Sequence, residues 1–522
     1  MTASASTPAS ASTPGKTPTP ASPPTPAYSD AYVSGIGGTP VGAGLDALAA
    51  ADPDAPAVTC AGVTLSRSQL ATASNRVARR MAELGVGPGS MVTSGLPNGI
   101  ANLVGSVATW KLGAVPQPVS AKLPAAELTA LLEIADAPVV LGLEPADGRP
   151  WLSEALIHEA AEDPALSDEP LPPVTPPSWK APTSGGSTGR PKIIVAGGEA
   201  TVEVITARTP ALRIEPDGTM LVTAPLYHNA PFMFSLIQLV AGGHVVVMQR
   251  FDAADVLEQV RRHRVTWLYA VPTLMGRIVR LPSEVRAAAD LSSVRTLLHV
   301  GAPCPEHVKR AWLDWVDPHV VLELYGGTES VSVSMIDGAE WLKRPGSVGT
   351  PTSGQMMIGD EDGRPLPVGE VGEVWMRPPP GVRTYRYLGA TSTVRDGWES
   401  FGDMGRMDAD GYLYLTDRRQ DMILIGGANV YPAEVEAALE SHPAVVSSAV
   451  IGLPDDDLGN VAHAIVHTDR EVSDESLREH LLSRLAPYKV PRTFERSSEP
   501  LRDDAGKVRR SALRAARLPA AG

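Results

Sequence analysis

Cysteine and long apolar segments are nearly absent from the sequence. Only Cys60 and Cys304 occur in 522 residues, and neither lies near a CxxC pattern or a Cys/His cluster, so a disulfide scaffold is excluded. No apolar run reaches the roughly 18 residues that cross a bilayer, and the N-terminus lacks the apolar segment of a secretory signal. These absences favour a cytoplasmic protein without a membrane span.

An excess of positive charge is also missing. The 59 acidic residues outnumber the 45 lysines and arginines, which gives a net charge of −14. That balance argues against nucleic acid or an anionic membrane as a partner. The length exceeds what one compact core accommodates, so at least two domains are expected. The sequence leaves a monomer and a homodimer equally open.

Residues 1–37 have a composition of their own. They are rich in Ser, Thr, Pro and Ala and contain almost no large aliphatic side chain. Such a segment cannot bury enough apolar surface to offset the entropy of ordering it. We therefore predict a disordered N-terminal extension.

From about Val41 the chain alternates helical and strand-like segments. Ser66 and Gln69 form a predicted capping box for a helix that ends near Gly85. Short apolar runs typical of buried strands begin at His244, Val265 and His319. Strands that alternate with helices and enter Gly/Pro turns indicate an α/β domain with substantial parallel sheet.

The pattern changes twice towards the C-terminus. Between Gly346 and Leu415, stretches such as GEVGEVWMR indicate short antiparallel strands with tight turns. After Asp417, one helix is predicted from Pro432, with proline as its first residue, and another over residues 473–485. Asp408 and Asp410 are spaced like metal ligands, but no EF-hand loop follows, so we interpret them as part of a β-turn. The last hundred or so residues therefore form a predicted α+β unit.

One loop has the composition of a phosphate-binding segment. It reads SGGSTGRPK from Ser184 to Lys192. Its small residues let backbone N–H groups converge on an anion, and Lys192 adds positive charge. The Walker A spacing is absent, which disfavours P-loop kinases and GTPases. Taken alone, the loop fits a mobile linker equally well.

Four further stretches decide between these interpretations. They are LYGGTES from Leu324, SFGDMG with Asp403, DRRQDMILIGGANVYPAEVE from Asp417, and DDAGKVRR with Lys507. Individually, the acids fit surface turns and the lysine fits a solvated tail. Together, in this order and spacing, they resemble the adenylate-forming superfamily of acyl-CoA synthetases, peptide-synthetase adenylation domains and luciferases. The resemblance extends from about Val41 to Arg510.

The resemblance implies an α/β fold in two domains. The larger, expected over 38–417, would combine βα layers with a small β-barrel-like subdomain, and the smaller, mobile α+β domain would occupy 418–522. It also implies a reaction in which a carboxylate attacks the α-phosphorus of ATP, with Mg²⁺ bound, to give an acyl-adenylate and pyrophosphate. Charge then builds on phosphoryl oxygens, so the protein must supply positioned cations rather than a nucleophile.

The same resemblance implies roles for individual residues. Lys507 would bridge the carboxylate and the α-phosphate, Thr328 would contact that phosphate, and Glu329 would hold Mg²⁺. Tyr325 would stack on adenine, and Asp403 would accept hydrogen bonds from the ribose. The remaining implied nucleotide contacts are Ser184, Gly185, Gly186, Ser187, Thr188, Gly189, Lys192, Gly301, Ala302, Pro303, Glu323, Gly326 and Arg418.

A second set of residues would serve transfer to coenzyme A. In the superfamily the small domain rotates about a hinge, here Gln420, and the segment with Gly426 and Gly427 would line the path of the pantetheine arm. His228 would stand between the acyl pocket and the thiol channel. The implied acyl-pocket residues are Met233, Phe234, Ile237, Val300, Gly327 and Val333. The glycines at 326 and 327 hint at a bulky or long acyl group, although they also fit a turn.

Two departures from the superfamily pattern keep alternatives open. Gln420 replaces the commoner Asp or Lys of the hinge, and Gly185 replaces a commoner Ser in the phosphate loop. The leading hypothesis is an acyl-CoA synthetase that uses ATP, Mg²⁺, a carboxylic acid and CoA. The alternatives are a ligase that mainly thioesterifies an adenylate made elsewhere, an enzyme that loads a free-standing carrier protein, and a non-catalytic acyl- or nucleotide-binding regulator.

Overall fold

The computed structural model describes residues 38–185, 191–392, 394–419, 421–425, 428–455, 458–503 and 506–518, with the backbone alone at 184, 185 and 418. The predicted N-terminal extension lies outside these residues. None of the helices that they form combines the length and apolar character that a membrane span requires.

A nine-stranded sheet forms the centre of the molecule. Its order is β15 (Thr350–Ser353), β14 (Val333–Asp337), β13 (Val321–Gly326), β12 (Thr296–His299), β11 (Trp267–Ala270), β9 (Thr219–Val222), β10 (His244–Val247), β1 (Pro56–Cys60) and β2 (Val63–Ser66). The strands from β13 to β1 run parallel to their neighbours, and β2, β14 and β15 pair antiparallel at the edges. Strands β10, β11 and β12 are buried at every residue, as expected for parallel strands covered on both faces. The predicted α/β fold is confirmed.

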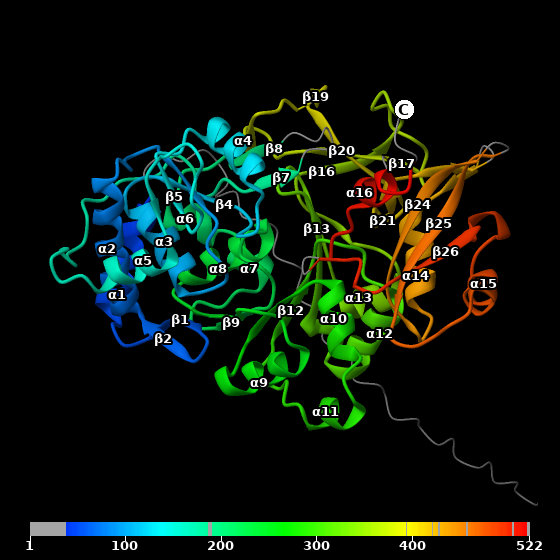
Figure 1. Ribbon diagram of the computed structural model, residues 1–522, viewed down its shortest axis with the longest axis horizontal. Coiled ribbons are helices and arrows are strands. Elements are labelled where there is room, and N and C mark those ends of the chain that lie inside the picture. Colours follow the sequence, from blue (N-terminus) through cyan, green and yellow to red (C-terminus); the bar gives the residue numbers. More distant parts are fainter. Residues whose placement is uncertain are drawn as a thin grey trace, which may run out of the picture.

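A smaller parallel sheet packs beside it with the first helices of the chain. Its strands are β4 (Val115–Pro118), β3 (Met91–Ser94), β5 (Val139–Leu141) and β6 (Trp151–Leu152). The helices are α1 (Val41–Ala51), α2 (Arg67–Glu83), α3 (Ile100–Lys111), α4 (Ala125–Ala135) and α5 (Glu154–Glu162), which gather at one end of the molecule (Figure 1). Helix α2 begins with the predicted capping box of Ser66 and Gln69, because each residue satisfies a backbone N–H of the other.

The helices that cover the large sheet follow in alternation with its strands. They are α6 (Val202–Thr206), α7 (Thr209–Leu212), α8 (Asn229–Val240), α9 (Ala253–His263), α10 (Pro272–Val279), α11 (Ser283–Ala288), α12 (Glu306–Trp315) and α13 (Gly338–Lys343). Helix α8 lies within the largest hydrophobic core, where Phe234 packs against Trp267 and Tyr269 of β11.

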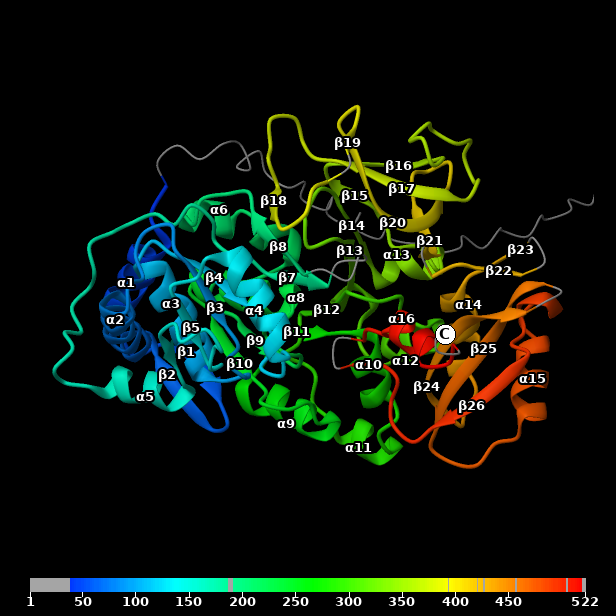
Figure 2. The same ribbon diagram turned by 45° about the horizontal axis from the view of Figure 1, so that its top comes forward.

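Two antiparallel sheets complete the large domain. One contains β7 (Thr183–Gly185), β8 (Pro191–Ala196) and β18 (Tyr385–Leu388). The other contains β16 (Gln355–Gly359), β17 (Gly372–Arg377), β20 (Trp398–Met407), β19 (Val394–Arg395) and β21 (Leu413–Arg418), and Figure 2 shows its strands above the edge of the large sheet. The antiparallel strands predicted between residues 346 and 415 are therefore confirmed.

The C-terminal domain has a core of its own. Its elements are β22 (Ile423–Ile425), β23 (Ala428–Val430), α14 (Pro432–Glu440), β24 (Val445–Asp455), β25 (Gly459–Thr468), α15 (Asp474–Leu482), β26 (Thr493–Ser497) and α16 (Arg510–Ala515). Helix α14 begins at Pro432 as predicted. Helix α15 ends before Leu485, because residues 483–485 close a turn onto the carbonyls of residues 479 and 481. This domain occupies the orange and red end of the molecule (Figure 1).

Arg280 and Gly506 make two of the contacts between this domain and the large one. Arg280 after α10 donates hydrogen bonds to the carbonyl oxygens of Val446 (3.2 Å) and Val445 (2.8 Å) at the start of β24. Gly506 faces Thr273 and Ala302, since a Cβ atom added there would lie 3.1 Å from Thr273 Oγ1 and 3.7 Å from Ala302 Cβ. The loop that carries Lys507 therefore lies against the end of β12.

Candidate active site

The predicted phosphate loop connects two paired strands, and its lysine reaches a distant carboxylate. Lys192 lies on β8, and its Nζ donates to Oε1 of Glu329 at 3.3 Å and to the hydroxyl of Tyr387 at 2.8 Å. The Tyr387 hydroxyl donates to the same Glu329 oxygen at 2.5 Å. The fold thus brings together the predicted phosphate-binding lysine and the predicted magnesium ligand.

Tyr387 was not predicted from the sequence. It lies on β18, which pairs with β8 so that Tyr387 stands opposite Ile194. Burial and the neighbouring Glu329 carboxylate raise the pKa of Tyr387, so its hydroxyl remains a hydrogen-bond donor at neutral pH. An open hollow of about 430 Å³ adjoins this tyrosine and is lined also by Arg383, Tyr385 and Arg386.

The chemistry of Glu329 fits a magnesium ligand. Its side chain is buried, and its two contacts are both donors to one oxygen, Oε1. No cluster of three or more His, Cys, Asp or Glu side chains that could hold a metal occurs in the described part of the chain. Magnesium commonly binds to one or two carboxylates plus substrate phosphates and water rather than to an all-protein cage. The residues present therefore fit Mg²⁺ bound together with a nucleotide.

Tyr325 and Asp403 also meet across two sheets. The Tyr325 hydroxyl, at the end of β13, donates to Oδ2 of Asp403 on β20 at 2.7 Å. The backbone of Asp403 pairs with that of Arg418 on β21, while the Arg418 side chain lies outside the described residues. The predicted adenine-stacking residue and the predicted ribose acceptor are therefore neighbours.

The segments 301–303 and 327–330 follow adjacent parallel strands, β12 and β13. The carboxyl ends of such strands are where ligands commonly bind in open α/β sheets. Gly301 has a φ of +93°, a conformation that favours glycine. Thr328 lies in a turn closed by a hydrogen bond from Ser330 N to Gly327 O of 3.0 Å. The predicted adenine-edge and phosphate contacts therefore share one end of the sheet.

Glu323 lies deeper than the other predicted nucleotide contacts. It is buried on β13, where it accepts a hydrogen bond from the fully buried Lys309, and its Oε2 lies 3.8 Å from His299 Nε2. Burial would raise the pKa of Glu323, but Lys309 and His299 hold it below its usual value. This carboxylate is already bound to Lys309 in the interior, and its predicted contact with nucleotide stays a prediction.

A buried lysine that sequence reasoning missed lies against the start of α8. His228 is the N-cap residue of α8, with its ring 4.1 Å from that of Tyr227. Next to it, Oδ1 of Asn229 accepts a hydrogen bond of 2.7 Å from Nζ of Lys180, a residue only 2% exposed. Burial and, to a smaller extent, Arg208 together lower the pKa of Lys180 to about 7 against the opposing effect of Glu329.

The predicted acyl-pocket residues belong to one core cluster, but their surroundings differ. Phe234 and Ile237 are fully enclosed, Val300 and Val333 are buried, and Met233 is half-buried. A Cβ atom at Gly327 would lie 2.9 Å from Oε2 of Glu329, so glycine at this position makes room for the carboxylate. The small size of Gly327 therefore gives no support to a bulky acyl group.

Two hydrogen bonds between Asp503 and Lys507 close the Lys507 loop. The N–H of Lys507 donates to Oδ1 of Asp503 at 2.9 Å, and the N–H of Asp503 donates to the carbonyl of Lys507 at 3.0 Å. Lys507 itself is exposed. Together with the Gly506 contact to Ala302, this places the predicted catalytic lysine beside the predicted adenine-edge segment.

Several predicted positions lie outside the described residues. They are Gly186, Ser187, Thr188, Gly189, Gln420, Gly426 and Gly427, together with the side chain of Ser184. At Gly185, where the sequence departs from the superfamily pattern, the backbone pairs with Pro191. The Asp408 prediction is confirmed, because its Oδ1 accepts hydrogen bonds from the N–H groups of Asp410 (3.0 Å) and Tyr412 (2.9 Å) within a turn.

Comparison with known proteins gives matches along most of the chain. Residues 45–386 match a family described as AMP-binding enzyme, and residues 434–504 match the C-terminal domain of AMP-binding enzymes. A feruloyl-CoA synthase from Amycolatopsis sp is 34% identical over 88% of this chain and 96% of its own length. A sulfoacetate–CoA ligase from Cupriavidus necator is 31% identical over 87% of this chain and 92% of its own length.

Solved structures agree with this match. The o-succinylbenzoate CoA synthetase from Bacillus subtilis, in complex with ATP and a magnesium ion, aligns with a TM-score of 0.77 at 27% identity, covering 90% of this chain and 98% of that one. The same synthetase with its acyl-adenylate intermediate aligns with a TM-score of 0.78 at 26% identity, covering 92% of this chain and 98% of that one.

Proposed function

Because the chain belongs to the AMP-binding enzyme family, we propose that it is an AMP-forming acid–CoA ligase that works through an acyl-adenylate. It would join a carboxylic acid to AMP with release of pyrophosphate, and then transfer the acyl group to the thiol of CoA. The observation that carries the proposal is the contact of Lys192 with Glu329, which are far apart in the sequence and meet beside the phosphate-loop strands.

The first half-reaction assigns a role to each charged group. A carboxylate oxygen attacks the α-phosphorus, and the bond from that phosphorus to the pyrophosphate oxygen breaks. Lys192 would neutralise charge on the leaving phosphates, and Lys507 would hold the attacking carboxylate against the α-phosphate. Glu329 would hold Mg²⁺, which supplies further positive charge at the phosphate oxygens when bound. Tyr325 and Asp403 would fix the adenosine.

The second half-reaction requires the C-terminal domain to expose a different face to the same site. We propose that residues 418–522 rotate against residues 38–417 about Gln420, which withdraws Lys507 and brings Gly426 and Gly427 to the thiol path. His228 would then stand beside the thioester. Reuse of one site by rigid rotation suits a hinge mechanism. CoA is the proposed acceptor, and a free-standing carrier protein is the alternative.

The test separates the two half-reactions. Aliphatic, aryl and polycyclic acids are first screened for CoA-dependent release of AMP. Lys507→Ala is then expected to abolish acid-dependent ATP–pyrophosphate exchange while it spares thioester formation from pre-made acyl-AMP and CoA. Lys489→Ala is the control, because Lys489 is bound to Glu434 in the same domain.

The outcomes distinguish the hypotheses. Equal loss of both activities in Lys507→Ala would overturn the role of this lysine. Thioester formation without pyrophosphate exchange in the unmodified protein would establish the thioesterification-dominant alternative. A protein that fails both assays with every acid and its adenylate would be a regulator rather than a ligase.

A further inference from the structure

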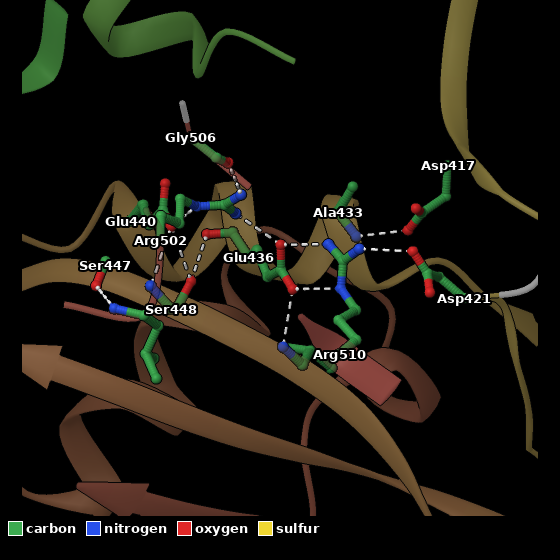
Figure 3. Close-up of polar contacts among 12 residues, drawn as sticks. Asp417, Asp421, Ala433, Glu436, Glu440, Ser447, Ser448, Arg502, Gly506 and Arg510 are labelled. Atoms are coloured by element: carbon green, nitrogen blue, oxygen red, sulfur yellow. Dashed lines mark hydrogen bonds and ion pairs between the residues drawn. The ribbon is translucent and has the colours of Figure 1, made fainter. Parts of the chain in front are cut away.

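The C-terminal domain contains a buried carboxylate whose acceptor positions are all occupied. Glu436 on α14 is 1% exposed. Its Oε2 accepts from Nη2 of Arg502 and Nη2 of Arg510, both at 2.7 Å, and its Oε1 accepts from Nε of Arg510 at 3.0 Å and from Val450 N at 2.8 Å. Figure 3 shows the two guanidinium groups converging on this side chain.

The two arginines lie on either side of the Lys507 loop in the sequence. Arg502 precedes the loop and also donates through Nη1 to the carbonyl of Gly506 at 3.2 Å. Arg510 follows the loop and begins α16. Since both guanidinium groups bind Glu436, the two ends of the loop are held together on the same helix. The closure of Asp503 onto Lys507 then fixes the backbone of the lysine within this frame.

The same network reaches the predicted hinge. Nη1 of Arg510 binds Oδ2 of Asp421 at 2.8 Å, and Asp421 directly follows Gln420 in the sequence. On the other side of the hinge, Asp417 accepts a hydrogen bond of 2.7 Å from Ala433 N at the start of α14. Arg510 therefore links the chain that leaves the hinge to the helix that holds the Lys507 loop.

Glu436 and its two arginines stabilise each other's charges. Burial would lower the pKa of Arg510, but the Glu436 carboxylate raises it. Glu440, one turn further along α14, binds Nε of Arg502 at 3.3 Å, and burial raises its pKa. Charge-assisted, bidentate contacts of this kind hold their partners in one geometry. A neutral amide in place of Glu436 would leave both guanidinium groups without their shared counter-charge.

We propose that Glu436 is a positioning residue for the adenylation step: through Arg502 and Arg510 it holds the Lys507 loop and the chain after the hinge as one rigid unit. The inference rests on the proposed function of Lys507. Misplacement of a catalytic group by about 1 Å can cost roughly 100-fold in rate. The loss should fall on the half-reaction that uses Lys507 and leave the other half-reaction intact.

The experiment compares Glu436→Gln with Glu434→Gln. Glu434 lies on the same helix, and its more exposed carboxylate pairs with Lys489. Glu436→Gln is expected to lower kcat of acid-dependent pyrophosphate exchange by about 10- to 100-fold. Thioester formation from pre-made acyl-AMP and the KM for ATP should stay within about threefold of the unmodified protein, a split that general unfolding would not produce. Glu434→Gln should change neither half-reaction.

A double-mutant comparison and a non-catalytic readout complete the test. In a Lys507→Ala background, Glu436→Gln should leave thioester formation from pre-made acyl-AMP at the rate of Lys507→Ala alone, because it acts only on the step that uses that lysine. Backbone hydrogen exchange in peptides that carry Lys507 should accelerate in Glu436→Gln and not in Glu434→Gln. Arg502→Lys serves in its place if Glu436→Gln does not fold.

Two results would overturn the inference. They are an equal loss of both half-reactions, or unchanged hydrogen exchange around Lys507 in the variant. The exchange measurement needs no turnover, so it tests the positioning of the loop even where the proposed reaction fails. Failure of the proposed function would instead show as the absence of both half-reactions in the unmodified protein.

Discussion

Lys180 in the large domain and Arg510 in the C-terminal domain are both enclosed cations, but their partners differ. Lys180 binds the neutral amide of Asn229, and among the described residues no carboxylate lies within ion-pair distance of its Nζ. Arg510 binds the carboxylates of Glu436 and Asp421. Burial lowers the pKa of Lys180 to about 7, whereas Glu436 outweighs burial and raises the pKa of Arg510.

This difference lies in how each charge is compensated within the protein. In the C-terminal domain each buried charge already has its counter-charge, so the network fixes geometry. In the large domain, the described residues give Lys180 an amide and the ring of Trp179, and Lys192 shares one oxygen of Glu329 with Tyr387. An anionic substrate would supply the missing negative charge there. Perturbed and incompletely paired groups of this kind are typical of functional sites.

The largest effect is expected at the buried glutamates of the two regions, Glu329 in the large domain and Glu436 in the C-terminal domain. Glu329→Gln should lower acid-dependent pyrophosphate exchange by about 100- to 1,000-fold, a magnitude typical of losing one electrostatic group at a reacting centre. Its urea unfolding midpoint should stay close to that of the unmodified protein, because among the described residues only Oε1 of Glu329 has hydrogen-bond partners. Glu436→Gln should show the larger loss of stability.

Steady-state exchange and urea titrations of both variants check this contrast, with Glu258→Gln on the exposed face of α9 as the control. If Glu329→Gln retained exchange within tenfold of the unmodified protein, the assignment of Glu329 to the magnesium site would be wrong.

An effect of intermediate size is expected in the pH dependence of the free energy of unfolding. The pKa of Lys180 is about 7 in the folded protein and about 10.4 when unfolded, so the unfolded chain binds more protons between these values. Stability should therefore rise with pH from about 7 to about 10, by at most about 1.4 kcal/mol per pH unit from this residue. Below about pH 7, Lys180 is charged in both the folded and the unfolded state, so its destabilising contribution has reached its full size.

Lys180→Met should remove this rise, which urea unfolding between pH 6 and pH 9 measures. Arg510→Met should instead lower stability throughout that range, because it leaves Glu436 without its bidentate partner. Parallel pH profiles for Lys180→Met and the unmodified protein would contradict the difference drawn between the two cations.

The smallest effect is expected at the Tyr325–Asp403 pair, because one of its two partners, Tyr325, is neutral. Tyr325→Phe removes a hydrogen bond of 2.7 Å, worth about 1–3 kcal/mol with a charged acceptor. The KM for ATP should rise by about three- to tenfold with little change in kcat. Tyr412→Phe, which removes a similar bond to Glu340, should leave the KM unchanged. An equal rise in both variants would contradict the role of Tyr325.

Much of the fold was predictable because its signals are local. The capping box at Ser66, the proline that begins α14 and the apolar runs of β10 and β11 each act within a few residues. The residues around Tyr325, Asp403 and Lys507 carry recognisable short motifs, which the sequence predicted as a site, and their individual roles stay predictions.

The residues that complete the site had no such signal. Tyr387 reaches Glu329 only because β18 pairs with β8 from a distant part of the chain. Lys180 lies outside the phosphate-loop motif, and its burial depends on the packing of α8. Glu436 sits among the buried residues of α14, where an acid is acceptable only because Arg502 and Arg510 arrive from later in the sequence. Such partners are set by tertiary structure.

Arg280 determines how the contact between the two domains responds to dissolved salt. It donates to the peptide carbonyls of Val445 and Val446, and the carboxylates of Glu440 and Asp469 in the C-terminal domain also attract its charge. Dissolved salt screens the attraction between ions over about 10 Å at 0.1 M, but a hydrogen bond to a carbonyl depends mainly on short-range geometry. Added salt should therefore weaken the attraction of Arg280 to Glu440 and Asp469 and leave its two carbonyl hydrogen bonds nearly unchanged.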